Sequence, residues 1–253
     1  MGILDEKAIM ITGAASGIGR ATAMGAAAEG AKLLLCDVND EQGEAEAAAI
    51  DGASFMHCDV TDEASVEAAV AAAVEQLGRL DGAFNCAGIL AAIGNTGDVP
   101  FDEWQKVIDV DLNGVFLCTK HQIQVMAEQG SGSILNMASA AGLIGWPGAG
   151  AYVAAKHGVV GLSKSAALEY AESGVRVNSI CPSYVLTPMV EKDLFEDTLG
   201  NDEELIAAAR ANHPIGRFAQ PPEIANAAVW LLSDKASFVT GAAMSVDGGY
   251  TTP

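Results

Sequence analysis

Tyr152 and Lys156 stand four residues apart in an Ala-rich stretch that favours a helix. This spacing places both side chains on one face of the helix. A free phenol has a pKa of about 10, too high for a base near neutrality. A neighbouring ammonium group favours the phenolate and lowers that pKa. The pair therefore predicts a general acid and base that exchanges a proton with an alcohol or a ketone.

Two further polar residues support this interpretation, because a Tyr/Lys pair at this spacing is common by itself. Ser139 follows a predicted strand at residues 133–137, at the sheet edge where doubly wound folds bind ligands. We expect its hydroxyl to hold the substrate oxygen beside Tyr152. We expect Asn113, in a predicted helix, to fix a water that relays protons from Lys156 to solvent.

A glycine-rich segment, TGAASGIG at residues 12–19, lies between the first predicted strand and the first predicted helix. Glycines permit a tight turn and let backbone N–H groups approach a pyrophosphate, and the helix adds its positive N-terminal end. The segment predicts a dinucleotide site. The expected contacts here are Gly13, Ser16, Gly17, Ile18 and Gly19.

An acidic residue at the end of the second predicted strand bears on the choice of cofactor. Asp37 stands about 20 residues after the glycines, where a carboxylate accepts hydrogen bonds from the ribose hydroxyls and repels a 2′-phosphate. The sequence therefore predicts NAD rather than NADP. Asp59 and Val60 suit the adenine edge, although the same pair could begin a turn. The segment at 85–88 adds Asn85, Ala87 and Gly88 as expected cofactor contacts.

Composition and charge exclude several classes of function. The 253 residues carry 13 basic and 33 acidic side chains, a net charge of −20, which opposes binding to nucleic acid or to an anionic membrane. No leader peptide and no apolar run of membrane-spanning length is found. Five cysteines without a CxxC pair predict reduced thiols in a cytoplasmic protein. The four histidines lack zinc-like spacing, so we expect no metal.

Short apolar runs alternate with longer helical stretches, which predicts an α/β fold with a Rossmann-like, doubly wound parallel sheet. We interpret residues 1–253 as a single dinucleotide-binding catalytic domain. The acidic stretch at 188–214 interrupts the alternation, and we expect a small helical substrate flap at about 186–215. The predicted strands are 8–12, 32–36, 54–57, 82–85, 133–137 and 175–181, and the predicted helices are 18–29, 41–50, 63–77, 101–128 and 152–170.

Together these residues resemble the short-chain dehydrogenase/reductase family along essentially the whole chain. The resemblance implies a sheet of about seven strands, a homotetramer, and catalysis by a tetrad, here Asn113, Ser139, Tyr152 and Lys156. It also implies that Pro182, Val185 and Thr187 contact the nicotinamide end, and that the DGGY ending at 247–250 belongs to a subunit interface. Two departures are Cys86, where Asn is frequent, and Ser183, where Gly is frequent. Ser183 puts the geometry of its loop in doubt.

We expect the substrate pocket to be formed by three segments, at 89–97, 140–146 and 184–199, with apolar and aromatic walls. Lys192 is the only Lys or Arg in these segments, which disfavours a strongly anionic substrate. The segments at 213–218 and 228–234 resemble the subgroup that acts on cyclic alcohols and diols. The expected substrate-binding residues are Ile93, Ser139, Leu143, Trp146, Tyr184, Met189 and Phe195.

Two alternatives remain open. A 3-oxoacyl-(carrier protein) reductase has the same fold and tetrad, but usually uses NADPH and meets an acidic carrier, which Asp37 and the net charge of −20 both oppose. A non-catalytic NAD-binding regulator would keep the fold and lose the tetrad, whereas all four residues are present here.

Overall fold

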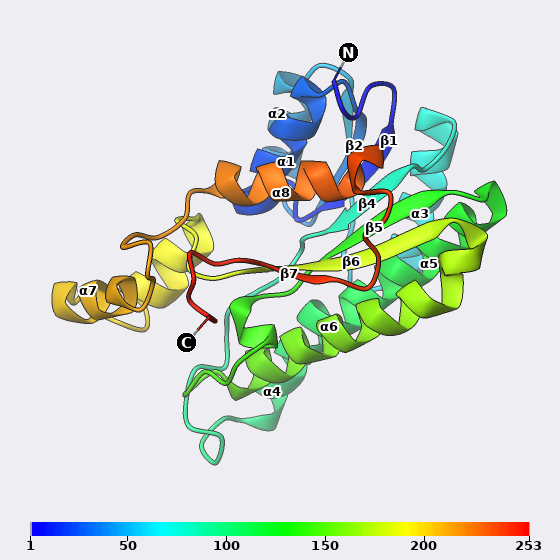
Figure 1. Cartoon of the computed structure of the whole chain (residues 1–253). Helices are drawn as coiled ribbons and strands as arrows, with labels where there is room; N and C mark the ends of the chain where they lie inside the picture. The colour runs from blue at the N-terminus through cyan, green and yellow to red at the C-terminus, as the bar shows by residue number, and fades with distance from the viewer. Residues whose placement is uncertain (1, 253) are drawn as a thin grey trace.

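One seven-stranded parallel sheet runs through the computed structural model, which describes residues 2–252. Its strand order, β3-β2-β1-β4-β5-β6-β7, reverses direction between β1 and β4 (Figure 1). This confirms the predicted doubly wound fold. The strands are β1 Ala8–Thr12, β2 Lys32–Asp37, β3 Ala53–His57, β4 Gly82–Asn85, β5 Gly132–Met137, β6 Val175–Pro182 and β7 Ala243–Val246.

Helices cover both faces of this sheet. Helices α1 and α8 contribute buried side chains to one face, where α2 adds the partly buried Ala47, and α3, α5 and α6 contribute buried side chains to the other. The helices are α1 Gly17–Ala28, α2 Asp40–Ala49, α3 Glu63–Leu77, α4 Phe101–Ile108, α5 Val115–Gln129, α6 Gly150–Tyr170, α7 Glu203–Ala211 and α8 Pro221–Leu232.

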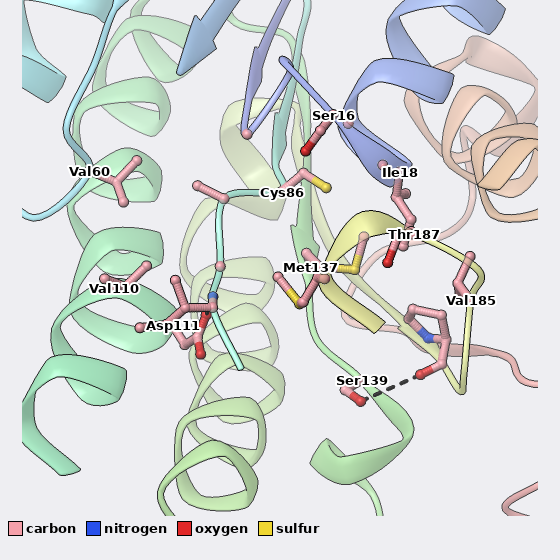
Figure 2. Close-up of a pocket in the computed structure, with 18 of the residues that line it drawn as sticks. Ser16, Ile18, Val60, Cys86, Val110, Asp111, Met137, Ser139, Val185 and Thr187 are labelled. Atoms are coloured by element: carbon pink, nitrogen blue, oxygen red, sulfur yellow. Dashed lines mark hydrogen bonds between the residues drawn. The ribbon is translucent and has the colours of Figure 1, made fainter. Parts of the chain in front are cut away.

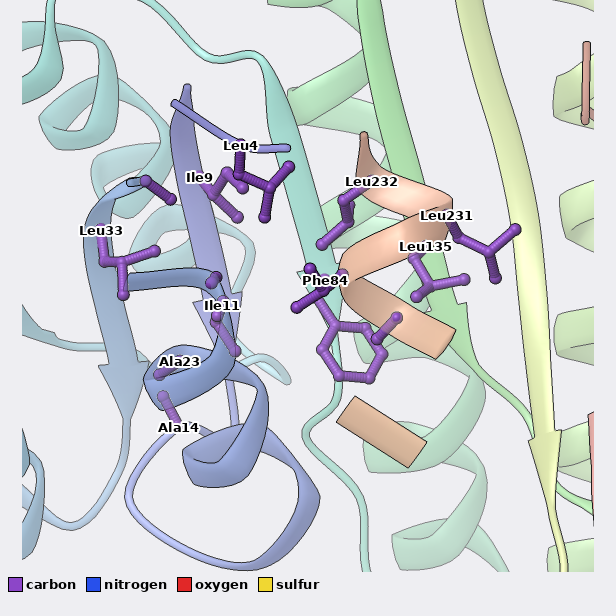
Figure 3. Packing of buried hydrophobic residues seen from close by; sticks show 14 of the residues in the cluster. Leu4, Ile9, Ile11, Ala14, Ala23, Leu33, Phe84, Leu135, Leu231 and Leu232 are labelled. Carbon is purple, nitrogen blue, oxygen red and sulfur yellow. The ribbon is translucent and has the colours of Figure 1, made fainter. Parts of the chain in front are cut away.

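The apolar character of the central strands explains why both faces are covered. Ile9 and Ile11 of β1 pack toward α1 and α8, whereas Met10 between them packs on the opposite face. Figure 3 shows Leu231 and Leu232 of α8 over the first of these faces. Successive strand residues point to opposite faces, so a strand buried on both sides is continuously apolar.

Two elements were not located from local sequence patterns. Strand β7 has only four residues and lies at the sheet edge, partly exposed, so it lacks the buried apolar run of the inner strands. Helix α8 begins at Pro221, and the Glu223 carboxylate in its first turn accepts from the backbone N–H of Gln220 at 2.9 Å. The helix predicted over 101–128 is interrupted by a π-helical segment, Asp109–Gly114, between α4 and α5.

The segment between β6 and α8 holds the predicted flap. It contains a π-helical turn, Val190–Glu196, followed by α7. Leu194 and Phe195 of the turn are buried against Phe218, which precedes α8. The flap is therefore anchored by apolar contacts near the carboxyl ends of the strands.

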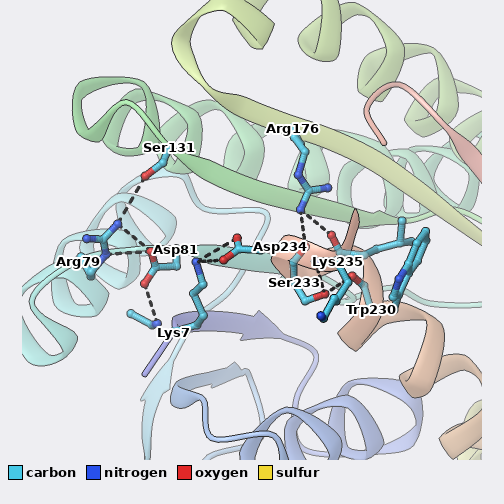
Figure 4. A network of polar contacts seen from close by, with 11 residues as sticks. Lys7, Arg79, Asp81, Ser131, Arg176, Trp230, Ser233, Asp234 and Lys235 are labelled. Atoms are coloured by element: carbon cyan, nitrogen blue, oxygen red, sulfur yellow. Dashed lines mark hydrogen bonds and ion pairs between the residues drawn. The ribbon is translucent and has the colours of Figure 1, made fainter. Parts of the chain in front are cut away.

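Polar contacts join elements at the opposite end of the sheet, where the strands begin (Figure 4). Arg176 of β6 donates to the carbonyl oxygens of Leu231 and Ser233 at the end of α8, at 2.9 and 3.1 Å. These carbonyls belong to the last turn of the helix, which lacks partners within the helix itself. Lys7 pairs with Asp234 nearby, at 3.1 Å. Across residues 2–252, no helix has the length and apolarity needed to cross a membrane.

Candidate active site

A cleft of about 360 Å³ opens at the carboxyl ends of the strands, where the strand order reverses between β1 and β4. Open α/β sheets bind ligands at this switch point. Figure 2 shows the cleft with Ser16 and Ile18 at the start of α1, Thr187 and Val185 after β6, and Asp111 on the helical side.

The glycine-rich loop needs glycine at two positions for different reasons. Gly13 has φ +64°, and a Cβ there would lie 2.8 Å from Ala87. Gly19 has an ordinary φ, but its Cβ would lie 2.1 Å from the carbonyl oxygen of Gly13. The loop is therefore folded back on itself and pressed against the segment after β4. Helix α1 has no acidic residue in its first turn, so its N-terminus fits a pyrophosphate.

Acidic side chains line the cleft near the carboxyl ends of β2 and β3. Asp37 lines the cleft and accepts a hydrogen bond from the backbone N–H of Ala15 in the glycine loop, at 3.0 Å. Asp59 also lines it, and its Oδ1 accepts from the backbone N–H of Thr61 at 2.9 Å. Arg20 is paired with Glu46 at 2.7 Å, and does not line the cleft. The expected cofactor residues in the cleft are Gly13, Ser16, Gly17, Ile18, Gly19, Asp37, Asp59, Val60, Ala87, Gly88, Tyr152, Lys156, Pro182, Val185 and Thr187.

Helix α6 carries Tyr152 and Lys156 in its first two turns, both facing the cleft. The Lys156 side chain is buried, and its Nζ donates to the carbonyl oxygen of Met137 at 3.1 Å and to Asp111 Oδ1 at 3.5 Å. The same Nζ lies 5.3 Å from the centre of the Tyr152 ring. The helical spacing therefore brings the ammonium and the phenol together, as the sequence predicts.

Ser139 completes the reactive end. It caps a short 3₁₀ helix, Ala140–Gly142, and its Oγ accepts from the N–H of Ala141 at 3.1 Å. The hydroxyl also contacts the carbonyl oxygen of Pro182 at 3.5 Å (Figure 2). Ser139 lines both the cleft at the switch point and the adjoining apolar cavity, so it stands at the junction of the two spaces.

The electrostatic environment of Tyr152 differs from the prediction. Burial raises the pKa of the phenol, and this outweighs the lowering by Lys156 and by the Ser139 hydroxyl. The negative charge of Asp111 raises the Tyr152 pKa further. The Lys156 ammonium thus lowers the Tyr152 pKa, as the sequence predicts, but in the chain by itself burial more than offsets this effect.

The structure contradicts the role predicted for Asn113. Its side chain is exposed, donates from Nδ2 to Asp109 Oδ1 at 2.9 Å, and does not line the cleft. Asp111, two residues earlier, is fully buried and reaches Lys156 instead. The reason is the π-helical segment Asp109–Gly114, which changes the face that each side chain presents.

Asn85 also departs from its predicted role, because its side chain does not line the cleft. It is buried, and its Nδ2 donates to Gln122 Oε1 and to Asn136 Oδ1, each at 2.9 Å. The amide therefore ties β4 to β5 and α5, and the backbone of the next three residues forms the cleft wall. Nothing in the local sequence distinguishes this buried polar cluster from a ligand contact.

An apolar cavity lies beside Ser139 and Tyr152, where the sequence predicts the substrate. Of the predicted wall residues, Trp146, Tyr184 and Met189 line it. Three others do not. Ile93 is 40% exposed, Leu143 packs against a separate core cluster, and Phe195 is buried behind the wall. Six further lining residues fall within the three expected segments: Leu90, Ala140, Ala141, Ile144, Val190 and Leu194. Ser183 and Tyr250 line the cavity from outside those segments.

Ser183, which stands where the family usually has Gly, holds its loop by hydrogen bonds. Ser183 Oγ donates to the carbonyl oxygen of Asp247 at 3.1 Å, and lies 2.9 Å from Nε2 of buried His213. The His213 ring packs edge-on against Tyr184 and tilted against Tyr250, with ring centres 5.5 and 5.0 Å away. Ser183 therefore links His213, which follows α7, to the C-terminal segment beside the apolar cavity.

Comparison with known proteins identifies the family of this site. A family model described as enoyl-(acyl carrier protein) reductase matches residues 13–251. The chain belongs to the short-chain dehydrogenase/reductase family. The chain is 47% identical to 2,5-dichloro-2,5-cyclohexadiene-1,4-diol dehydrogenase from Sphingobium indicum over 253 residues, 99% of each protein.

Two solved structures of this family are similar to the chain. The crystal structure of levodione reductase superposes with a TM-score of 0.95 at 42% identity, covering 98% of both chains. A 3-ketoacyl-(acyl-carrier-protein) reductase from Brucella melitensis, complexed with NADH, has a TM-score of 0.90 at 34% identity, covering 98% of this chain and 99% of that chain. Within residues 2–252, no cluster of three or more His, Cys, Asp or Glu side chains suits a metal ion.

Two glycines of helix α1 provide a matched test of the glycine loop. Gly19→Ala should weaken NADH binding by more than about tenfold, about 1.4 kcal/mol, because the new Cβ meets the Gly13 carbonyl oxygen. Gly25→Ala meets only the Val229 side chain, at 3.5 Å, and should raise the free energy of unfolding by about 0.5–1 kcal/mol. NADH fluorescence titration and urea denaturation measure the two effects. Equal NADH affinity in both variants would contradict the role of the loop.

Proposed function

We propose that this short-chain dehydrogenase/reductase transfers a hydride between NAD(H) and the ring carbon of an apolar cyclic or aryl secondary alcohol or its ketone. The carrying observation is that Ser139 and Tyr152 line both the dinucleotide cleft and the apolar cavity beside it. A substrate oxygen held by these two hydroxyls lies at the junction of the two spaces. Lys156, buried behind Tyr152, supplies the charge that the phenolate needs.

The chain's own groups handle the proton and the substrate oxygen. In alcohol oxidation the Tyr152 phenolate takes the hydroxyl proton, Ser139 holds the oxygen, and the Lys156 ammonium stabilises the phenolate. In ketone reduction the same phenol returns the proton to the oxygen. NAD, bound along the glycine loop, would supply the hydride acceptor for oxidation, and NADH would supply the hydride donor for reduction.

Two features of the cleft favour NAD over NADP. Asp37 is held against the glycine loop by the N–H of Ala15, at the position where an adenosine ribose would lie. Lys156 is the only Lys or Arg among the residues lining the cleft, and it stands at the opposite, reactive end. A 2′-phosphate would therefore meet carboxylates and no cation.

The cavity supports an apolar ring as substrate. Its walls include Trp146, Met189 and Leu194, and no Lys, Arg, Asp or Glu lines it. Two related proteins are named for cyclic substrates, a chlorinated cyclohexadienediol and levodione. The hydroxyls of Tyr184 and Tyr250 in the wall offer partners for a second oxygen on such a ring.

The 3-oxoacyl-(carrier protein) reductase alternative receives less support. One similar structure is such a reductase, at 34% identity. An acidic carrier would approach a chain with net charge −20, and like charges disfavour that encounter. A non-catalytic NAD-binding regulator would not need Ser139, Tyr152 and Lys156 together at the cleft.

We also propose that the enzyme is a cytoplasmic homotetramer. All five cysteines are free thiols, as suits a reducing compartment. Phe101 of α4, Phe116 of α5 and Leu168 of α6 are exposed, at 76, 47 and 85%. Exposed apolar side chains on adjoining helices suit contact with further subunits.

Light scattering should report about four times the 25.8 kDa chain mass, and a monomer would contradict the proposal.

Removing the Tyr152 hydroxyl tests the acid and base directly. Tyr152→Phe should lower kcat by about 10²- to 10⁴-fold, with NADH binding retained. In the unaltered enzyme, oxidation needs the phenolate, whose pKa burial raises, so kcat/KM for oxidation should increase with rising pH through the alkaline range. Tyr170→Phe, at the far end of the same helix, is the control and should leave kcat unchanged. Full turnover in Tyr152→Phe would refute the mechanism.

Cofactor preference tests the role of Asp37. The enzyme should prefer NADH to NADPH in kcat/KM, and Asp37→Asn should reduce that preference by about tenfold or more, because the carboxylate no longer repels the 2′-phosphate. Asp40→Asn removes an exposed carboxylate three residues away that pairs with His57, and should leave the preference intact. A preference for NADPH in the unaltered enzyme would favour the carrier-protein reductase instead.

A further inference from the structure

A buried carboxyl group, that of Asp111, lies beside Lys156. The family resemblance implies an asparagine, assigned to Asn113, in this place. Asp111 has an exposed fraction of 0%, and lines the floor of the cleft next to Val110 (Figure 2). Its Oδ1 accepts from the N–H of Ile89 at 3.0 Å and from Lys156 Nζ at 3.5 Å. Burying a carboxyl group is costly unless it is paired, so Lys156 is its natural counter-ion.

The surrounding backbone fits this carboxyl group closely. Gly88 lies against it, and a Cβ on Gly88 would come within 2.6 Å of Asp111 Oδ1 and 3.4 Å of Lys156 Nζ. The π-helical segment Asp109–Gly114 turns Asp111 toward the cleft and leaves Asn113 outside. Among residues 2–252, no hydrogen-bond donor reaches Asp111 Oδ2. The protein therefore compensates the carboxylate through one oxygen only.

Lys156 has two acidic neighbours that compete for one ammonium charge. Its Nζ lies 3.5 Å from Asp111 Oδ1 and 5.3 Å from the centre of the Tyr152 ring. An anion at Asp111 attracts the ammonium and repels a phenolate at Tyr152, so both effects keep the phenol protonated. An uncharged amide at the same position would do neither.

We propose that Asp111 is a positioning residue that acts through Lys156 and sets the pH at which Tyr152 works. Asp111 is a carboxylate, paired with the Lys156 ammonium, over the range in which Tyr152 loses its proton. Its charge moves the ionisation of the phenol to higher pH. The inference rests on the proposed function only for its kinetic consequence, because the ionisation of Tyr152 can be measured without a substrate.

Few other ionisable groups face this cluster. Cys86, after β4, is near both Tyr152 and Lys156, and a negative charge on its thiol raises the pKa of each. Burial raises the pKa of the Cys86 thiol itself to about 12. Cys181, at the end of β6, is near Lys156, and burial raises its thiol pKa to about 11. Both thiols remain uncharged below the alkaline range. Burial also raises the pKa of Asp111, against the opposing effects of Lys156 and of the Ile89 N–H.

The test compares two carboxylates of the same π-helical segment. Asp111→Asn keeps the shape and an oxygen that accepts from Ile89 and Lys156, but removes the charge. Asp109→Asn removes a carboxylate whose partner is Asn113, and serves as the matched control. Circular dichroism and NADH titration verify that both variants fold and bind cofactor.

The first measurement is a titration of tyrosinate absorbance in the cofactor-free chain, with Tyr152→Phe subtracted in each background. The Tyr152 transition should move to lower pH in Asp111→Asn and stay in place in Asp109→Asn. Only four tyrosines are present, so a single residue's contribution is resolvable. An unmoved transition, or one moved to higher pH, overturns the proposal whether or not the enzyme oxidises cyclic alcohols.

The second measurement is the pH profile of kcat/KM with cyclohexanol and NAD. On the acidic limb, Asp111→Asn should raise kcat/KM for oxidation by roughly threefold to tenfold at fixed pH, while the plateau changes little. A merely structural role would lower the plateau and leave the limb in place, and this result would overturn the proposal. Absence of oxidation in all variants, together with a shifted tyrosinate transition, would refute the proposed substrate class and retain the role of Asp111.

Discussion

The buried ammonium group of Lys156 is the constraint on which the reactive end depends. It is anchored by the Met137 carbonyl oxygen at the end of β5, touches Asp111 of the π-helical segment, and lies beside the Tyr152 ring. A charge in this position requires partners from several elements at once. One side chain therefore connects strand β5, helix α6 and the π-helical segment, and the proposed proton chemistry depends on its position.

The fold was largely readable from the sequence, because its signals are local. The inner strands are nearly continuous apolar runs, which is typical of strands covered on both faces. All five residues of β1, Ala8–Thr12, are buried. The glycine loop was readable for the same reason, since its spacing is fixed by close backbone approach at Gly13 and Gly19. The short edge strand β7 carries no such signal, since it is only partly buried.

The sequence does not predict that Asp111 lies beside Lys156, because this depends on a helix geometry that residue spacing does not determine. Asn113 and Asp111 both fall inside the predicted helix over 101–128, and a regular helix gives no reason to prefer Asp111. The π-helical segment decides between them by turning Asp111 inward. Asn85 was misassigned for a related reason, since only the fold reveals Gln122 and Asn136 beside it. The walls of the apolar cavity come mostly from segments that the sequence indicated, whereas Ser183 and Tyr250 join them through contacts between distant parts of the chain.

A crystal structure of the chain with NAD and a cyclic alcohol tests the central claim most directly. We expect the nicotinamide ring between Ser139 and Thr187, the substrate oxygen within hydrogen-bonding distance of the Tyr152 and Ser139 hydroxyls, and Lys156 still donating to the Met137 carbonyl oxygen. A complex in which the Tyr152 hydroxyl points away from the substrate oxygen, or in which Lys156 leaves its place behind the phenol, would contradict it.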